Sequence, residues 1–222
     1  MILSYLKYLL QRKSKYKVHS PFVYDFMTKV LYDNGANRDY DTILRTSRLL
    51  DGKKYATFAR RKKSRFLYRM VRHFEPHVVV SFGQLSVLNT TALALGNLLT
   101  KVYLDQSSDF LDTLISMGIV NVNLFRRDKP EEEQLERLNL DFVYFGLNDF
   151  GDDTWNKLDE ALTQANEDTI LLFEGIHHSP RTEAAWEAIM AEEDVTLSID
   201  IYSFGMVFFR EGMEKQDFVL KY

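Results

Sequence analysis

From residue 77 onward, short apolar segments alternate with longer amphipathic ones, and this alternation constrains the fold more than any other feature of the sequence. The apolar segments predict five strands, at 77–82, 101–105, 121–125, 141–146 and 169–174. Helices are predicted near 87–99, 107–117, 130–138, 152–165 and 181–192. Such spacing is typical of a parallel sheet with right-handed crossovers and helices on both faces. We therefore expect an α/β fold.

The end of the chain departs from this alternation. Residues 194–200 and 203–210 are both strand-like, and only two residues separate them. Two residues can close a hairpin but cannot hold a crossover helix, so the last strand must run antiparallel to its neighbour. The predicted sheet has seven strands, and the seventh is antiparallel.

The first 75 residues predict helices rather than strands. Apolar residues recur at helical spacing near the N-terminus and predict an amphipathic helix, namely Ile2, Leu3, Leu6, Leu9 and Leu10. Ser20 and Pro21 are typical of the cap and first position of a second helix. A short helix at 41–50 and a basic helix at 55–74 follow. We predict two parts, a basic N-terminal helical extension (1–75) and a Rossmann-like domain (76–222).

Charge is divided unevenly between these two parts. Residues 1–75 carry 18 Lys and Arg against 6 Asp and Glu, whereas residues 76–222 carry 10 against 26. A basic zone can meet nucleic acid, anionic lipid or an anionic substrate, and it can equally dock on the acidic half of its own chain or of a second copy. We favour docking, because no aromatic-interleaved RNA motif accompanies the charge. The basic cluster at 60–63 is a candidate anion site, although we favour a solvated helical face.

Composition excludes several classes of protein. The sequence has no cysteine, which excludes disulfides, thiolate nucleophiles and Cys-ligated metals. It has no run of about eighteen apolar residues that could span a membrane. Its N-terminal apolar residues precede the basic ones, which is the wrong order for a secretory signal. We expect a cytoplasmic protein without a membrane span.

The first predicted strand leads into a turn of the kind that holds nucleotides. The segment HVVVSFGQLSVLNTTALALG, residues 77–96, predicts a strand, a turn at Gly83 and a helix whose N-terminus offers free backbone N–H groups. Only one glycine lies in this turn, where nucleotide folds usually have two or three. Asp105 follows Gly83 by 22 residues, close to the spacing at which an acid binds ribose hydroxyls. The alternative for Asp105 is an N-cap of the next helix.

Several longer phrases point to a family. The phrases are HSPFVYDF at 19–26, RFLYRMVRHFEP at 65–76, FEGIHHS at 173–179 and EAAWEAIMAEEDVTLSIDIYSFGMVFFREG at 183–212. They are similar to those of a bacterial group of small class I S-adenosylmethionine-dependent methyltransferase-like proteins, over nearly the whole chain. The resemblance implies a seven-stranded sheet whose seventh strand inserts antiparallel between the fifth and sixth. It also implies S-adenosylmethionine as cofactor and methyl transfer to a small molecule.

The resemblance assigns residues to the cofactor site, and some of them are altered. The group's first strand ends in an acid, Leu-Gly, a short linker and a second Gly. In this sequence, those positions hold Ser81, Phe82, Gly83 and Val87. Ser81 and Gly83 are therefore candidate cofactor-binding residues, whereas Val87 places a branched side chain where the ligand would come close. Asp105 corresponds to the acid that binds the ribose.

The fourth strand is followed by further candidates. The group's DxVFIDGNH reads DFVYFGLND here, so Gly146 replaces an acid, Asp149 replaces a His, and Asn148 remains. Asn148 and Glu174, at the fifth strand, complete the candidate cofactor-binding residues. In metal-dependent catechol-type methyltransferases, acids at these strand ends hold a divalent cation. A hard cation needs several oxygen ligands, and this set is too thin, so we predict no metal site.

His177 and His178 follow the fifth strand and are the candidate catalytic residues. The pKa of an imidazole lies near working pH, and ligands of α/β proteins bind at carboxyl strand ends. Either residue could therefore be the general base that removes a proton from the methyl acceptor. The alternative is a structural role in the loop.

Three functions remain open from the sequence. The first is an S-adenosylmethionine-dependent methyltransferase that acts on a small molecule. The second is a degenerate, non-catalytic fold that serves as a binding or assembly module, as the changes at Ser81, Val87 and Gly146 indicate. The third is a nucleic-acid-associated protein or RNA methyltransferase, which we rank last because acidic residues dominate the half with the site. The N-terminal helices are also a candidate homodimer interface.

Overall fold

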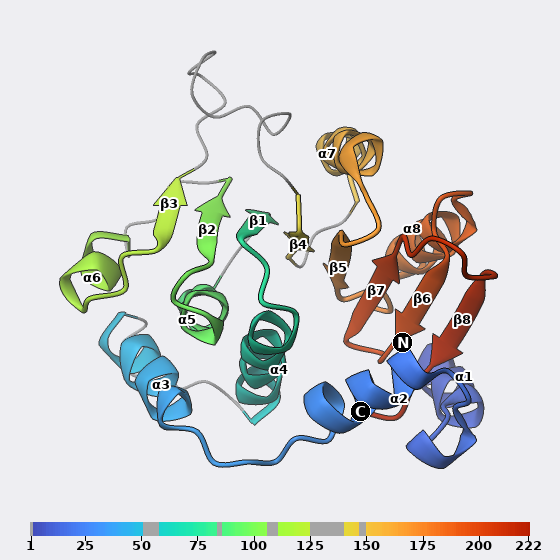
Figure 1. Cartoon of the computed structure of the whole chain (residues 1–222), viewed down its shortest axis with the longest axis horizontal. Coiled ribbons are helices and arrows are strands. Elements are labelled where there is room, and N and C mark those ends of the chain that lie inside the picture. The colour runs from blue at the N-terminus through green and yellow to red at the C-terminus, as the bar shows by residue number, and fades with distance from the viewer. Residues whose placement is uncertain (1, 51–57, 84–85, 106–110, 125–139, 147–149) are drawn as a thin grey trace.

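The computed structural model describes residues 2–50, 58–83, 86–105, 111–124, 140–146 and 150–222 (Figure 1). The helices are α1 (Ile2–Gln11), α2 (Pro21–Phe26), α3 (Arg38–Leu50), α4 (Phe58–Phe74), α5 (Val87–Gly96), α6 (Leu111–Ser116), α7 (Asp152–Gln164) and α8 (Pro180–Ala191). Two short helical turns, η1 (Lys15–Lys17) and η2 (Met27–Leu31), lie on either side of α2. The strands are β1 (Val78–Phe82), β2 (Lys101–Leu104), β3 (Val122–Leu124), β4 (Phe142–Phe145), β5 (Ile170–Glu174), β6 (Leu197–Asp200), β7 (Phe204–Phe208) and β8 (Gln216–Val219).

These strands form one sheet in the order β3-β2-β1-β4-β5-β7-β6-β8. β1 pairs in parallel with β2 and β4, and β4 pairs in parallel with β5. β7 inserts between β5 and β6 and runs antiparallel to both. The predicted α/β fold with an antiparallel seventh strand is confirmed.

The sheet has one strand more than the seven that the sequence predicts. β8 pairs in parallel with β6 at the edge of the sheet. The N-terminal segment reaches this edge, where the backbone N–H of Lys13 donates to the carbonyl of Val219 at 2.7 Å. β8 is therefore held partly by a segment from the opposite end of the chain.

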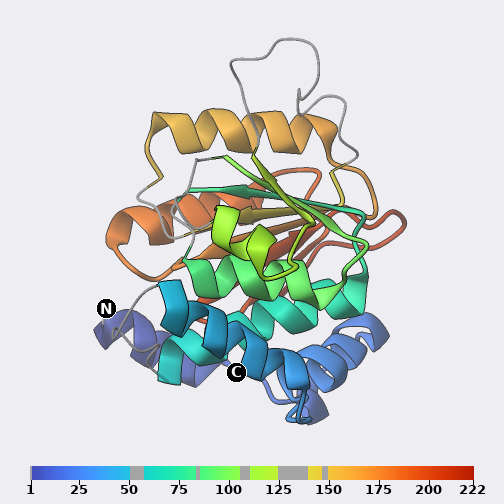
Figure 2. The ribbon, with the colours of Figure 1, turned by 90° about the vertical axis from the view of Figure 1, so that its left-hand side faces the viewer.

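Both faces of the sheet are buried. Successive residues of a strand point to opposite faces, and the core divides accordingly into two clusters. Val79, Phe142 and Leu172 belong to the cluster beneath α4 and α5. Val80 and Val143 belong to the cluster beneath α7 and α8. Figure 2 shows α7 above the sheet, and α3, α4 and α5 below it.

Two glycines allow neighbouring elements to pack closely. A Cβ atom on Gly96 would lie 2.7 Å from Cβ of Val71, so α5 packs directly against α4. A Cβ atom on Gly205 in β7 would lie 2.7 Å from the ring of Trp186 in α8. Trp186 is thus a core residue.

The N-terminal helices pack on the rest of the chain. Phe26 and Phe66 share one buried cluster with Leu172 and Phe204. The hydroxyl of Tyr8 in α1 donates to the carbonyl of Leu220 at 2.7 Å. The apolar side chains on the other face of α1 stay in contact with solvent, and Leu3 and Leu10 are 81% and 88% exposed.

Most predicted boundaries lie within three residues of the observed ones. α3 begins three residues before the predicted helix at 41–50, because Asn37 caps it by accepting from the backbone N–H of Asp39 at 2.9 Å. The predicted cap at Ser20 is present. The predicted helix at 130–138 lies outside the described residues. Within the described part of the chain, no helix is long and apolar enough to cross a membrane.

Candidate functional site

The carboxyl ends of β1, β2 and β4 meet at the turn that contains Gly83. Gly83 has φ +82°, a conformation that favours glycine. The backbone N–H of Gly146 donates to Phe82 at 2.9 Å, and that of Asp105 donates to Ser81 at 3.0 Å. The fold therefore brings together the predicted residues Ser81, Gly83 and Asp105.

Ser81 and the start of α5 show what this turn offers to a ligand. The Ser81 side chain is fully buried, and its hydroxyl has no hydrogen-bond partner among the described residues. A buried polar group without a partner is costly. At the start of α5, the Ser86 hydroxyl accepts from the backbone N–H of Asn89 at 3.2 Å, so the chain itself caps part of this helix N-terminus. Val87, which replaces a glycine of the resembling group, is buried in the first turn of α5.

Asp105 is engaged by a lysine of α7. The Lys157 ammonium lies 2.5 Å from the Asp105 carboxylate and 2.7 Å from that of Asp153, one helical turn away. The side chains of Asp105 and Lys157 are only 8% and 9% exposed. The Lys157 ammonium also lies 5.3 Å from the centre of the Phe82 ring. The Asp105 carboxylate, predicted from the sequence to bind ribose hydroxyls, thus already has a charged partner.

The carboxylates keep Lys157 protonated. Burial alone would lower the pKa of Lys157, but the hydrogen bonds and charges of Asp105 and Asp153 outweigh burial and raise it. A buried ion pair is weak evidence for stability, yet removal of one partner leaves an uncompensated charge. A ligand that binds the Asp105 carboxylate must therefore displace the Lys157 ammonium, which would then pair with Asp153 alone or be solvated by water.

Glu174, at the end of β5, is the centre of a second paired cluster. Lys63 of α4 donates to one oxygen of its carboxylate at 2.7 Å. Tyr144 of β4 donates to the other oxygen, which also accepts from the Asn89 amide at 3.5 Å. The Glu174 side chain is 10% exposed, so these donors replace the water that it loses.

Tyr144 completes this cluster from inside the sheet. It is fully buried, and burial together with the charge and hydrogen bond of Glu174 raises its pKa well above the usual range. The hydroxyl therefore stays protonated and acts as a donor. Two further donors of the site, Lys63 and Lys157, escape prediction from the sequence, because each lies on a helix where a lysine is normally solvated. The only sequence signal for Lys157 is Asp153, four residues before it.

His177 lies between two carboxylates. Its Nε2 atom is 2.8 Å from Asp200 and its Nδ1 atom is 3.2 Å from Glu183, and its ring stacks on that of Tyr202. Burial alone would lower the pKa of His177, but the hydrogen bonds and charges of Asp200 and Glu183 raise it. Both ring nitrogens are therefore occupied, and the protonated form is favoured.

The other predicted residues differ in their surroundings. His178 is exposed. Asn148 and Asp149 lie outside the described residues. Among the residues that are described, no three His, Asp or Glu side chains form a group that could hold a metal ion.

Two cavities lie near these groups. One, of about 170 Å³, opens beside Lys63 and is lined mainly by aromatic and basic side chains from α1, α4 and the turn after β6, among them Tyr5, Tyr8, Lys62, Tyr202 and Tyr222. The other, of about 400 Å³, lies between α1, α8, β6 and β8 and includes His177, Glu183 and Asp200. The first cavity is connected to the Glu174 cluster through Lys63.

Comparison with solved structures identifies the fold as that of class I methyltransferases. The SAH-bound methyltransferase PaMTH1 of Podospora anserina is similar with a TM-score of 0.58 and 12% identity, over 87% of this chain and 98% of its own. The O-methyltransferase TomG of Streptomyces achromogenes, which is involved in tomaymycin synthesis and was solved in complex with SAM, has a TM-score of 0.54 and 14% identity, over 85% and 95%.

A third solved structure agrees. The O-methyltransferase of Bacillus cereus in complex with SAH has a TM-score of 0.54 and 15% identity, over 84% of this chain and 97% of its own. Similarity at these identities shows the fold alone. No family model and no curated protein matches the sequence.

Proposed function

We propose that the chain is an S-adenosylmethionine-dependent methyltransferase that acts on a small molecule. One observation carries the proposal. The unpaired hydroxyl of Ser81, the positive-φ turn at Gly83 and the Asp105 carboxylate gather at the ends of β1 and β2. They do so in a fold whose solved relatives include proteins in complex with SAM or SAH.

The residues present fit this cofactor. Asp105 would accept hydrogen bonds from ribose hydroxyls, the unpaired Ser81 hydroxyl would gain a partner, and Gly83 would let the backbone come close. When bound, the cofactor supplies an electrophilic methyl group on a sulfonium. The chain mainly has to align donor and acceptor for an in-line displacement.

Lys157 makes the binding of this cofactor conditional. Its ammonium occupies the Asp105 carboxylate, so ribose binding would require it to turn away. Asp153, already 2.7 Å from the ammonium and largely exposed, would keep the charge partly compensated. We therefore assign Lys157 the role of a clamp that holds Asp105 in the absence of cofactor.

The methyl acceptor is assigned to the cavity beside Lys63. Its volume of about 170 Å³ admits only a very small acceptor or the reacting part of a larger one, and its tyrosine-rich wall offers hydroxyl and aromatic contacts. His178 is exposed beyond β5 and is assigned the removal of the acceptor proton. His177, held by Asp200 and Glu183, is assigned to positioning of the same loop.

Titration calorimetry with S-adenosylmethionine and with its demethylated product tests the proposal. We expect saturable heat for both, and methyl transfer to at least one member of an acceptor panel that His178→Ala abolishes while cofactor binding remains. Absence of heat at high micromolar ligand, in the wild-type chain and in Lys157→Met alike, would overturn it.

The second candidate function is a non-catalytic binding or assembly module. The specific observation in its favour is that both carboxylates at the site, Asp105 and Glu174, are satisfied by lysines of the chain itself. Turnover of any acceptor would exclude this candidate. Cofactor binding without turnover would support it.

A further inference from the structure

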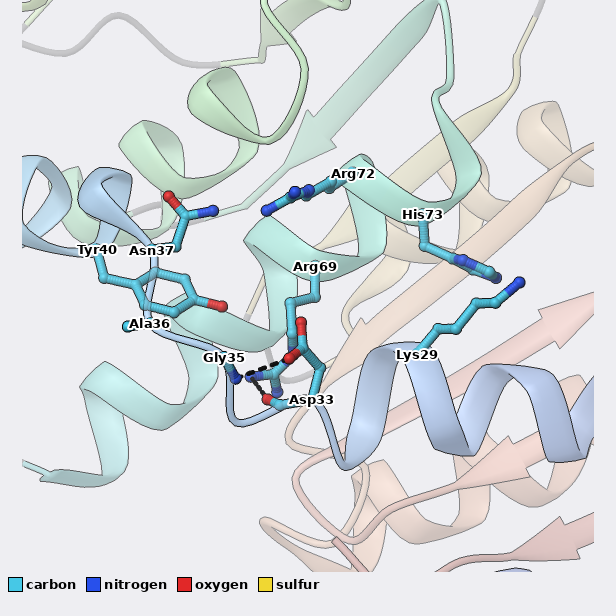
Figure 3. Close-up of a pocket in the computed structure, with 9 residues that line it drawn as sticks. All are labelled: Lys29, Asp33, Gly35, Ala36, Asn37, Tyr40, Arg69, Arg72 and His73. Atoms are coloured by element: carbon cyan, nitrogen blue, oxygen red, sulfur yellow. Dashed lines mark hydrogen bonds between the residues drawn. The ribbon is translucent and has the colours of Figure 1, made fainter.

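A separate cavity of about 370 Å³ lies at the other end of α4 (Figure 3). It is lined by side chains of α4, of η2 and of the segment that leads into α3, namely Lys29, Asp33, Gly35, Ala36, Asn37, Tyr40, Arg69, Arg72 and His73. α4 ends at Phe74, four residues before β1 begins at Val78. The cavity is therefore near the amino edge of β1, whereas the methyltransferase site is at the carboxyl edge.

The charge of this cavity is predominantly positive. Lys29, Arg69 and Arg72 line it with one carboxylate, that of Asp33, and the Asp25 carboxylate lies 3.7 Å from His73. The Asp33 carboxylate turns back on its own loop, where it accepts from the backbone N–H of Gly35 at 2.8 Å. Lys29 is paired with Asp25 at 2.9 Å, so the two arginines supply the uncompensated charge.

Arg69 is a buried cation that is only partly satisfied. Arg69 is only 8% exposed. Its guanidinium donates to the carbonyl of Asp33 at 3.0 Å and to the hydroxyl of Tyr222 at 3.2 Å. Its Nε atom has no partner among the described residues, and no carboxylate of the described chain pairs with its charge. A buried guanidinium without a counter-ion is costly, so an anionic ligand in the cavity would stabilise it.

Arg72 supplies an accessible second guanidinium. It lies three residues after Arg69, so both side chains leave the same face of α4. Arg72 is exposed and forms no hydrogen bond or ion pair with the part of the chain that the structure describes. Figure 3 shows its guanidinium extending towards Asn37 on the opposite wall. Asn37 is held in place by Tyr68, to which its amide donates at 2.7 Å.

The helix dipole explains only part of this arrangement. Cations in the last turn of a helix are favourable, which accounts for Arg72 and His73 as isolated residues. The helix dipole does not account for the burial of Arg69 one turn earlier, nor for the cavity between α4 and the segment that leads into α3. The cluster at 60–63 contrasts with it, because Lys62 lies over the ring of Tyr222 and Lys63 binds Glu174.

We propose that this cavity binds the phosphate group of a small phosphorylated molecule, with Arg69 as the buried anchor and Arg72 as the open arm. Guanidinium groups match the geometry of phosphate oxygens and bind them through charge-assisted hydrogen bonds. The volume lies at the lower end of small-molecule sites, about 300–1,000 Å³, which leaves room for a phosphate and a small organic group. The site is independent of the proposed methyl transfer.

Titration of the full chain with inorganic phosphate, at constant ionic strength set with sodium chloride, tests this proposal. We expect saturable binding that sulfate competes and chloride does not. Arg72→Gln should weaken phosphate binding by at least about tenfold, or ~1.4 kcal/mol. Because Arg72 is exposed, this variant should fold normally, which circular dichroism verifies.

Arg45→Gln is the matched control, since Arg45 is an exposed arginine of α3 that does not line the cavity. It should bind phosphate as the wild type does. Equal affinity of Arg72→Gln and wild type would overturn the proposal, as would absence of saturation in the wild type at tens of millimolar phosphate. Equal weakening by both variants would mean a diffuse basic face and would overturn it as well.

Discussion

α4 carries basic residues near both of its ends, and the chain uses them in opposite ways. Near its start, Lys63 is bound to Glu174 of β5 at 2.7 Å. Near its end, Arg72 is unpaired within the described structure and Arg69 has only neutral acceptors. The difference follows from the sheet, because a strand ends in a carboxylate beside one end of the helix and not beside the other. Position relative to strand ends, rather than density of charge, decides which end of a basic helix keeps uncompensated charge for an anionic ligand.

The largest expected effect comes from removing the acceptor at the paired end. Glu174→Leu leaves Lys63, Tyr144 and Asn89 without their shared carboxylate. Breaking a buried pair in this way costs about 3–5 kcal/mol, and urea denaturation should show a loss of that order. Glu193→Leu, at an exposed position, is the control and should change the free energy of unfolding little. A small loss for Glu174→Leu would mean that the cluster is solvated rather than paired.

Breaking the pair of Lys157 with Asp105 should cost slightly less stability than Glu174→Leu, and a double substitution can test the pairing itself. Lys157→Met should destabilise the chain by about 3 kcal/mol, because Asp105 is then buried without its partner. Adding Asp105→Leu should recover most of that loss, since replacing a buried pair with apolar groups is often neutral. A double-mutant cycle by urea denaturation measures both. Simple additivity of the two losses would contradict the pairing.

Two histidines, His177 in the loop after β5 and His73 in the basic cavity, should make stability respond to pH with opposite signs. The pKa of His177 is raised, so its stabilisation is present below pH 6.5 and is lost as pH rises through the folded value. The pKa of His73, in the basic cavity, is lowered, because burial, together with the charge of Lys29, outweighs the opposing charge of Asp25. Its cost is therefore absent above pH 6.5 and appears as pH falls towards the folded value.

Denaturation between pH 5 and 9 measures this contrast in two variants. His177→Asn should flatten the decline of stability above pH 6.5, and His73→Asn should flatten the decline below it. If both substitutions changed the pH dependence of stability on the same side of pH 6.5, the electrostatic difference between the surroundings of the two histidines would be refuted.

The smallest effect is expected at the open end of α4. Arg72→Gln should change the free energy of unfolding by no more than about 0.5 kcal/mol, as for most surface substitutions. Denaturation in the absence of phosphate measures it. A loss of several kcal/mol would mean that Arg72 has a structural partner and is not available to a ligand.

The sequence predicts the alternating strands and helices and the antiparallel hairpin, because the alternation of segments and the two-residue gap are local signals. The place of the seventh strand between the fifth and sixth follows only from the resemblance to the methyltransferase-like group. The sequence fails at β8, which is short, polar and stabilised by pairing with β6 and Lys13. It places Gly83, Asp105 and Glu174 correctly at strand ends. It misses Lys63 and Lys157, because burial of a lysine depends on which carboxylate the folded chain places beside it.

Calorimetric titration of S-adenosylmethionine into the wild-type chain and into Lys157→Met tests the central claim most directly, with circular dichroism as the control for folding. If Lys157 clamps Asp105 until the cofactor displaces it, both proteins bind, and the variant binds about tenfold more tightly, a gain of ~1.4 kcal/mol. Equal affinities, or no heat in either protein, would contradict the account.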